Sequence, residues 1–157
     1  MGTPGLPAAP QGGVARQERQ YVEDFFVYNI SFNSIAPAIT QVGNIQIQAD
    51  SRFKWLKATF NANVLTAGAP DDQQYGTRNM PDITVQMVDS GSGRQLFQNP
   101  APVHTLFGTG QLPFILPVPR IFQARSNIAI TIANFSATDT FRLDLELIGT
   151  KIFDLAS

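Results

Sequence analysis

Short runs of alternating apolar and polar residues, separated by glycine- and proline-containing turns, constrain the fold of this chain most strongly. In Ile83–Met87 and Ile128–Ile132 every second residue is a large apolar side chain, and the same alternation runs from Phe141 to Leu147. A period of two is that of a β-strand with one buried face, whereas an amphipathic helix repeats every ~3.6 residues. These three segments are therefore predicted to be half-buried strands.

The rest of the chain is predicted to add shorter strands. They lie within Tyr21–Tyr28, Val42–Ala49, Phe53–Leu65, Gln95–Phe97 and Val103–Phe107. The first half of Gln17–Tyr28 also fits a short helix, and residues 89–93 are predicted to close a hairpin. Roughly eight or nine closely spaced strands favour an all-β, antiparallel two-sheet sandwich. A jelly roll is the preferred arrangement, and an immunoglobulin-like sandwich is the alternative.

Several details of the sandwich follow from local sequence. Phe53–Leu65 has apolar residues on both faces and is predicted to be buried on two sides. Gly149 is expected to break the last strand, and the prolines in Pro113–Pro119 make that stretch irregular or an edge, since proline cannot donate to a ladder. The predicted core consists of Ile45, Ile47, Trp55, Ile83, Val85, Ile128, Ile130, Leu143 and Leu145.

The N-terminal segment differs from the rest of the chain in composition. Seven of the residues in Met1–Gly13 are glycine or proline, and the first charged residue is Arg16. Such a segment does not favour a helix or a central strand. We divide the chain into an extended arm, residues 1–20, and a sandwich domain, residues 21–157. The arm is expected to become ordered against a neighbouring subunit.

Charge is scarce. Charged residues make up 15% of the chain and the net charge is −1, against about 25% charged residues in typical soluble domains. A neutral polar surface is cheaper to desolvate than a charged one, which favours a protein that contacts other proteins. Direct nucleic-acid binding is not expected, because the lysines and arginines form no basic patch. No apolar run is long enough to span a membrane, and no signal peptide is expected.

Few residues point to chemistry. The chain has no cysteine and one histidine, His104, so a thiol nucleophile and a multi-histidine metal site are excluded. Asp71 and Asp72 match no EF-hand spacing and are expected to be solvated. Asp144 and Glu146, which share a strand face with Arg142, are interpreted as a solvated or interface face.

Two further patterns resemble functional motifs. Gly108–Pro113 is interpreted as a turn, because it lacks the lysine of a phosphate-binding loop. The glycosylation sequons at Asn29 and Asn134 matter only in a secreted protein. No catalytic, cofactor-binding or metal-binding site, and no small-molecule substrate, is predicted.

The pattern of predicted strands and turns resembles that of a known group of proteins. The segments that carry the resemblance are Ile45–Trp55, Phe107–Gly110, Leu112–Leu116, Pro119–Phe122, Asn127–Asn134 and Phe141–Phe153. Over roughly residues 25–153, the chain resembles a group of small structural proteins encoded near the capsid genes of tailed bacteriophages. The resemblance implies a jelly-roll cement, or decoration, protein on the exterior of the capsid, assembled in the host cytoplasm. It also implies that the protein bridges neighbouring major capsid protein subunits and self-associates into a homo-oligomer.

Two other classes of function stay open at this point. A receptor-binding or fibre-tip module would bind host carbohydrate and would show an exposed aromatic and acidic pocket. A small hydrolase would need a cleft with converging titratable groups. A cement protein would instead show a broad, flat surface of mixed polarity.

Overall fold

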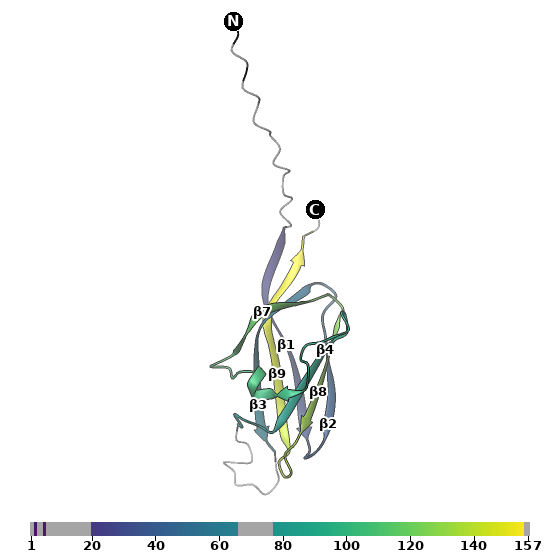
Figure 1. Ribbon diagram of the computed structural model, residues 1–157, viewed down its shortest axis with the longest axis vertical. Helices are drawn as coiled ribbons and strands as arrows, with labels where there is room; N and C mark the ends of the chain where they lie inside the picture. The colour runs from purple at the N-terminus through teal and green to yellow at the C-terminus, as the bar shows by residue number, and fades with distance from the viewer. Residues whose placement is uncertain (1, 3–4, 6–19, 66–76, 156–157) are drawn as a thin grey trace.

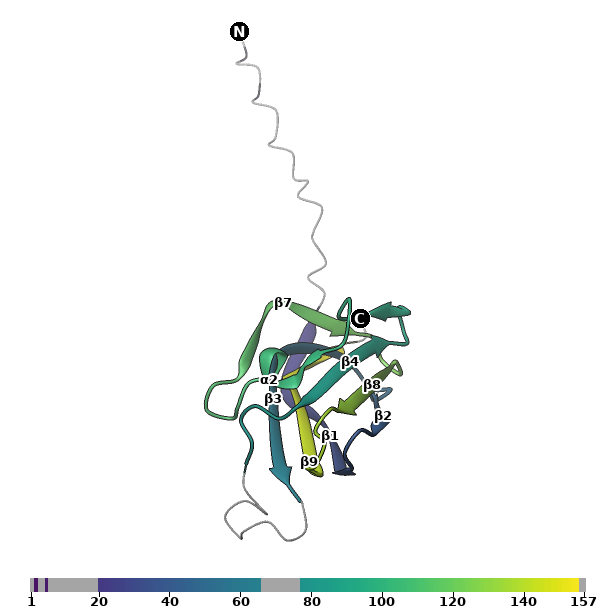
Figure 2. The same cartoon turned by 60° about the horizontal axis from the view of Figure 1, so that its bottom comes forward.

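The computed structural model describes residues 2, 5, 20–65 and 77–155. This part of the chain forms two antiparallel sheets that pack as a sandwich, so the prediction of an all-β fold is confirmed (Figures 1 and 2). The elements are β1 (Tyr21–Ile35), β2 (Thr40–Gln46), β3 (Arg52–Val64), β4 (Ile83–Asp89), β5 (Arg94–Gln95), β6 (Ala101–Pro102), α2 (Val103–Leu106), β7 (Phe114–Phe122), β8 (Asn127–Asn134) and β9 (Phe141–Asp154).

The strand order follows a nested pattern. Sheet A has the order β1-β9-β3-β7, and sheet B has the order β2-β8-β4-β5, with β6 also paired to β4. The first strand thus pairs with the last, the second with the eighth, the third with the seventh, and the fourth with the short strands after it. Both sheets combine strands from the two halves of the chain, and apart from the local pairs of β4 with β5 and β6 their neighbouring strands are distant in sequence.

The core lies between the two sheets and contains all nine predicted core residues. Burial alternates along β4 and β8, where Val85, Ile128 and Ile130 have no exposed surface. Burying an aliphatic side chain of this size contributes roughly 1.5–3 kcal/mol relative to leaving it exposed. The alternation in the sequence therefore identified the inward faces of β4 and β8 correctly.

A β-bulge in β3 changes which residues face the core. Between Trp55 and Lys57 the register with β9 shifts by one residue, which leaves Leu56 without an opposite partner. The bulge reverses the alternation, so Trp55 before it and Ala58 and Phe60 after it are all buried in the same core. The prediction that this strand is buried on two sides is therefore wrong.

Gly149 does not break β9, which continues from Phe141 to Asp154. The glycine lies opposite Trp55, next to the bulge, where the two backbones come unusually close. A Cβ atom at position 149 would lie 1.9 Å from the carbonyl oxygen of Lys54. Glycine is needed here for close approach of two strands, and the expected strand break is wrong.

The predicted strand Val103–Phe107 is instead one turn of helix, α2. Val103 and Phe107 are buried, and the amide of Phe107 donates to the carbonyl of Val103 at 2.9 Å. The spacing of four residues places both apolar side chains on the same side of a helical turn. A strand would have placed the exposed Thr105 beside them, which explains why the helix is preferred.

The remaining local predictions have mixed outcomes. Strand β1 covers all of Tyr21–Ile35 and is longer than predicted. Strand β7 is an edge strand whose register with β3 jumps between Ile115 and Arg120, as its prolines indicated. The hairpin at residues 89–93 pairs β4 with β5 and is confirmed. Nearly all of the proposed arm, and the loop residues 66–76, lie outside the described residues.

Candidate docking surfaces and a lateral pocket

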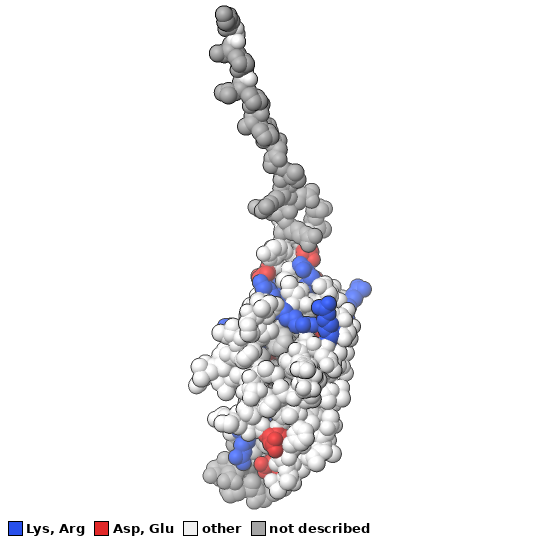
Figure 3. All heavy atoms as spheres, in the orientation of Figure 1, with Lys and Arg blue, Asp and Glu red and all other residues white. Residues whose placement is uncertain are grey.

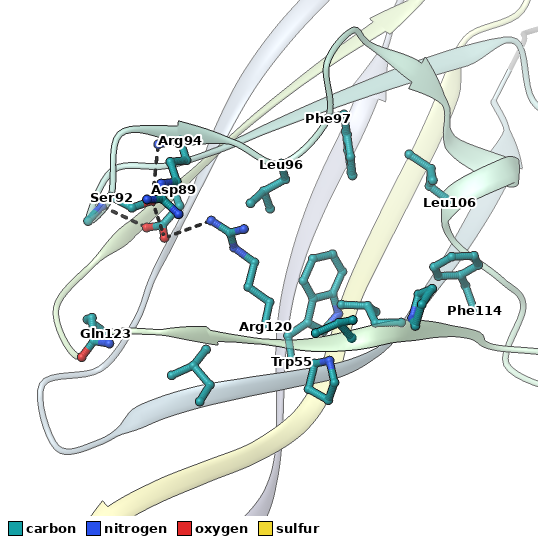
Figure 4. A pocket seen from close by; sticks show the side chains of 16 residues that line it. Trp55, Asp89, Ser92, Arg94, Leu96, Phe97, Leu106, Phe114, Arg120 and Gln123 are labelled. Carbon is teal, nitrogen blue, oxygen red and sulfur yellow. Dashed lines mark hydrogen bonds and ion pairs between the residues drawn. The ribbon is translucent and has the colours of Figure 1, made fainter.

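A pocket of about 650 Å³ opens at the side of the sandwich, where β7 faces β5 and α2 (Figure 4). We call it the lateral pocket. Its apolar wall consists mainly of Trp55, Leu96, Phe97, Leu106, Phe114 and Leu116, and its polar end holds Asp89, Arg94 and Arg120. Sequence reasoning did not find this pocket, because its walls come from strands and loops far apart in the chain.

The charged end of the lateral pocket is organised by internal contacts. Asp89 is buried and accepts hydrogen bonds from the amide of Gly91 at 2.9 Å and the hydroxyl of Ser92 at 3.1 Å. Arg120 forms an ion pair with Asp89 at 3.6 Å (Figure 4). Asp89 is the one carboxylate among the described lining residues, whereas glycoside hydrolysis generally requires two. These groups hold the β4–β5 turn in place.

Trp55 forms part of the pocket wall and is not free to stack on a sugar ring. Its side chain is 5% exposed, and its indole N–H donates to the carbonyl of Lys57 at 2.7 Å. Its ring also stacks on Phe122, with 6.1 Å between the ring centroids. A carbohydrate platform normally presents the face of an aromatic ring to solvent, and this one is covered.

The outer face of sheet A is charged. Its strands present Glu23, Arg52, Lys54, Lys57, Arg142, Asp144 and Glu146 on the side opposite the core. Several of these residues are paired: Lys54 lies 3.6 Å from Glu23, and Arg142 lies 3.5 Å from Asp144. Asp144 also accepts a 2.6 Å hydrogen bond from Ser31, and Glu146 accepts one from Thr59 at 3.0 Å. These two carboxylates belong to a polar sheet face, as predicted.

The outer face of sheet B carries no charged side chain on its three long strands. The positions opposite the core are Thr40, Val42, Asn44 and Gln46 on β2, Asn127, Ala129, Thr131 and Ala133 on β8, and Thr84, Gln86 and Val88 on β4. We call this surface the neutral face. In Figure 3 the visible surface over these strands is white, while the coloured side chains gather near the two ends of the domain.

The strands of the neutral face are paired in continuous register. Val42, Thr131 and Gln86 lie side by side across the three strands, and the rows on either side follow the same pairing. At one end, Ile39 and Phe135 add exposed apolar surface next to the last residue of β8, whose amide donates to the carbonyl of Ile39. Interface centres are depleted of charge, and among the described surfaces the neutral face fits that composition best.

Lys151 is a buried lysine whose contacts connect elements of the fold. Its ammonium group lies 3.3 Å from Asp50, donates to Gln48 and sits 4.1 Å from the centroid of the Phe26 ring. Burial alone would raise the pKa of Asp50, but hydrogen bonds from Ser51 and Lys151 and the charge of Lys151 outweigh it and lower that pKa. The pair joins the β2–β3 turn to β9.

The other candidates from the sequence are placed apart from one another. His104 lies on α2, and its buried Nδ1 has no hydrogen-bond partner among the described residues. Gly108–Pro113 forms a turn in which the Thr109 hydroxyl accepts from the amide of Leu112 at 3.1 Å. Asp71 and Asp72 lie outside the described residues. Within the described ranges, no three acidic or histidine side chains are grouped to hold a metal ion.

Asn134, one of the two sequon asparagines, is a buried structural residue. Its amide nitrogen lies 3.1 Å from the carbonyl of Ile35, 3.2 Å from that of Ala36 and 2.9 Å from that of Asp139. Its side-chain oxygen accepts from the amide of Ser136 at 2.9 Å. An amide nitrogen buried in this way is inaccessible in the folded domain.

No helix in the described ranges is long and apolar enough to cross a membrane. No protein-family model matches the chain, and no curated protein is significantly similar to it.

Proposed function

We propose that this protein is a capsid-stabilising protein of a tailed bacteriophage, and that it binds the major capsid protein through the neutral face. In this proposal the sandwich is a jelly roll on the shell exterior that bridges neighbouring capsid subunits. The nested pairing of strands supports the jelly roll, because a long hairpin folded over on itself gives that order. The protein is proposed to act without a cofactor and not as an enzyme.

One observation carries the proposal: the contrast between the two outer faces of the sandwich. Charged side chains are spread over the outer face of sheet A, and the three long strands of sheet B present none. Transferring a neutral amide or hydroxyl group into an interface costs little once it finds a hydrogen bond, whereas an unpaired charge costs far more. A neutral face therefore lowers the desolvation cost for a domain that remains bound to a protein surface.

The N-terminal arm is proposed to assist this attachment. Leu6, Pro7 and Pro10 supply apolar contacts, and no residue of Met1–Gly13 is charged. Proline restricts the backbone before binding, which lowers the entropy lost when the segment becomes ordered. In the proposal, the arm lies along a neighbouring subunit.

A carbohydrate-binding module at a fibre tip is the second candidate, and the lateral pocket is the observation that favours it. The pocket combines aromatic side chains with an aspartate. Its tryptophan is covered and its aspartate is engaged in the β4–β5 turn, so this reading has weaker support than docking through the neutral face.

Binding to shells tests the proposed function. Purified protein should co-sediment with empty shells assembled from the phage's major capsid protein, and binding should saturate at a fixed ratio to the capsid subunits. The same preparation should show no saturable binding to an oligosaccharide array. Absence of shell binding together with specific glycan binding would exclude the cement function and support the fibre-tip module.

A further inference from the structure

The outer edge of β1 is an unpaired strand edge. β1 is the terminal strand of sheet A and pairs only with β9 along Tyr21–Phe32. Within the described part of the chain, no backbone hydrogen bond reaches the opposite edge of β1 between Tyr21 and Asn33. A row of amide and carbonyl groups is thus available for pairing with another strand.

Between Phe25 and Phe32, this edge lacks the features that usually prevent strand pairing. Exposed edges are commonly blunted by proline, charge or a bulge. The opposite edge strand, β7, has two prolines and a register jump. In β1 the register is regular from Tyr21 to Phe32 and shifts only between Phe32 and Ile35, and after Glu23 and Asp24 the strand contains no charged residue. Sheet A is therefore protected at one edge and open at the other.

The side chains along the open edge favour burial. Tyr21 and Phe25 are 55% and 74% exposed, and both lie on the outer face of β1. β2 is the neighbouring edge of sheet B, since Gly43 lies against the side chains of Ile30 and Phe32. This strand adds no charge to the same side of the sandwich.

We propose that β1 pairs antiparallel with β1 of a second copy across a twofold axis, which joins two copies of sheet A into one continuous sheet. A second copy fits because the strand is complementary to itself. A register centred on Asn29 places Phe26 opposite Phe32 and Tyr28 opposite Ile30, which keeps the pairing within the regular part of β1. The acidic residues at the start of the strand then lie outside the paired segment. Twofold contacts of this kind are the commonest in homo-oligomers.

The surface area buried in the expected dimer is small, and this limits the strength of the dimer in solution. Pairing about seven residues at ~3.3 Å per residue, along an edge roughly 10 Å thick, buries on the order of 500 Å² in total. Stable complexes typically bury about 1,200–2,000 Å². The dimer should therefore be weak in solution and become strong when both copies are held on one surface. That use of the dimer rests on the proposed function, but the pairing itself does not.

Two asparagines on the outer face of sheet A provide a matched test. Asn29 lies on β1 and Asn61 lies on the interior strand β3, and both are exposed. Asn29→Lys places like charges opposite each other at the twofold axis, whereas Asn61→Lys adds the same charge away from the edge. Sedimentation equilibrium of the full-length protein, from micromolar to millimolar concentration and without shells, should show at least a ~10-fold weaker dimer for Asn29→Lys. Asn61→Lys should dimerise like the unmodified protein.

The absence of cysteine allows a second measurement of the same geometry. Facing residues in an antiparallel pair have Cα atoms about 4.5–5.5 Å apart, which suits a disulfide. Asn29→Cys should form a covalent dimer under mild oxidation, and Asn61→Cys should stay monomeric. A protein that is monomeric at millimolar concentration, or a dimer that Asn29→Lys leaves intact, would overturn the inference. Because no capsid is present, either result leaves the shell-binding proposal to its own test.

Discussion

Replacing Gly149 by alanine should destabilise the domain by about 3 kcal/mol or more, enough to unfold a large part of a marginally stable population. The added Cβ would meet the Lys54 carbonyl at 1.9 Å. Because that oxygen belongs to the backbone of β3, no side chain can rotate away to make room. The β3 bulge and the β9 register would both have to shift.

Gly110→Ala is the control for this substitution, since a Cβ at Gly110 would meet no atom within 4 Å. Urea unfolding followed by tryptophan fluorescence is suitable, because Trp55 lies beside the bulge. The Gly149→Ala midpoint should fall sharply and the Gly110→Ala midpoint should move little. Equal midpoints would mean that the two strands are not in close contact at this position.

Replacing Asn134 by leucine should destabilise the domain by about 3–4 kcal/mol. The side chain is 2% exposed and bonds the backbone of the β1–β2 turn and of the β8–β9 turn. Leucine has similar volume but leaves these buried carbonyls and the Ser136 amide without partners, and each such loss costs about 1–3 kcal/mol.

Asn127→Leu provides the comparison at the other end of β8. Its side chain is partly exposed and donates to Asn44 at 2.9 Å, where water can replace the bond. We expect a change below about 1 kcal/mol for Asn127→Leu. Thermal unfolding of both variants measures the difference, and a similar loss in both would show that Asn134 does not organise the two turns.

The local pattern of the sequence was enough to predict most of the strands and the inward face of most of them. Alternation in β4, β8 and β9 indicates that one side of each strand is buried. This pattern can be read from the sequence of each strand alone. The turn at residues 89–93 was likewise predictable, because glycine and serine next to an aspartate mark a hairpin. These three strands supply six of the nine confirmed core residues.

The errors arose where the outcome depends on a partner strand. The bulge at Leu56 and the need for glycine at position 149 both come from the close pairing of β3 with β9, which are distant in sequence. The helical turn α2 was visible in the spacing of Val103 and Phe107, but the β-branched residues around it pointed to a strand.

The candidate surfaces were only partly predictable for the same reason. The neutral polar positions of β4 and β8 can be read from the sequence, including Thr84, Gln86 and Thr131. The strand order is needed to show that they lie side by side. The open edge of β1 and the lateral pocket likewise exist only in the folded topology.

Binding of charge variants to shells tests the central claim, which is that the neutral face docks on the capsid. Val42 on β2 and Ile115 on β7 are both β-branched edge-strand residues, 64% and 65% exposed, on the outer faces of different sheets. Val42→Glu and Val42→Lys should each weaken co-sedimentation with shells about 100-fold, because either charge would be buried unpaired. Ile115→Glu should bind like the unmodified protein. Unchanged binding by both Val42 variants, or loss of binding by Ile115→Glu alone, would contradict docking through the neutral face.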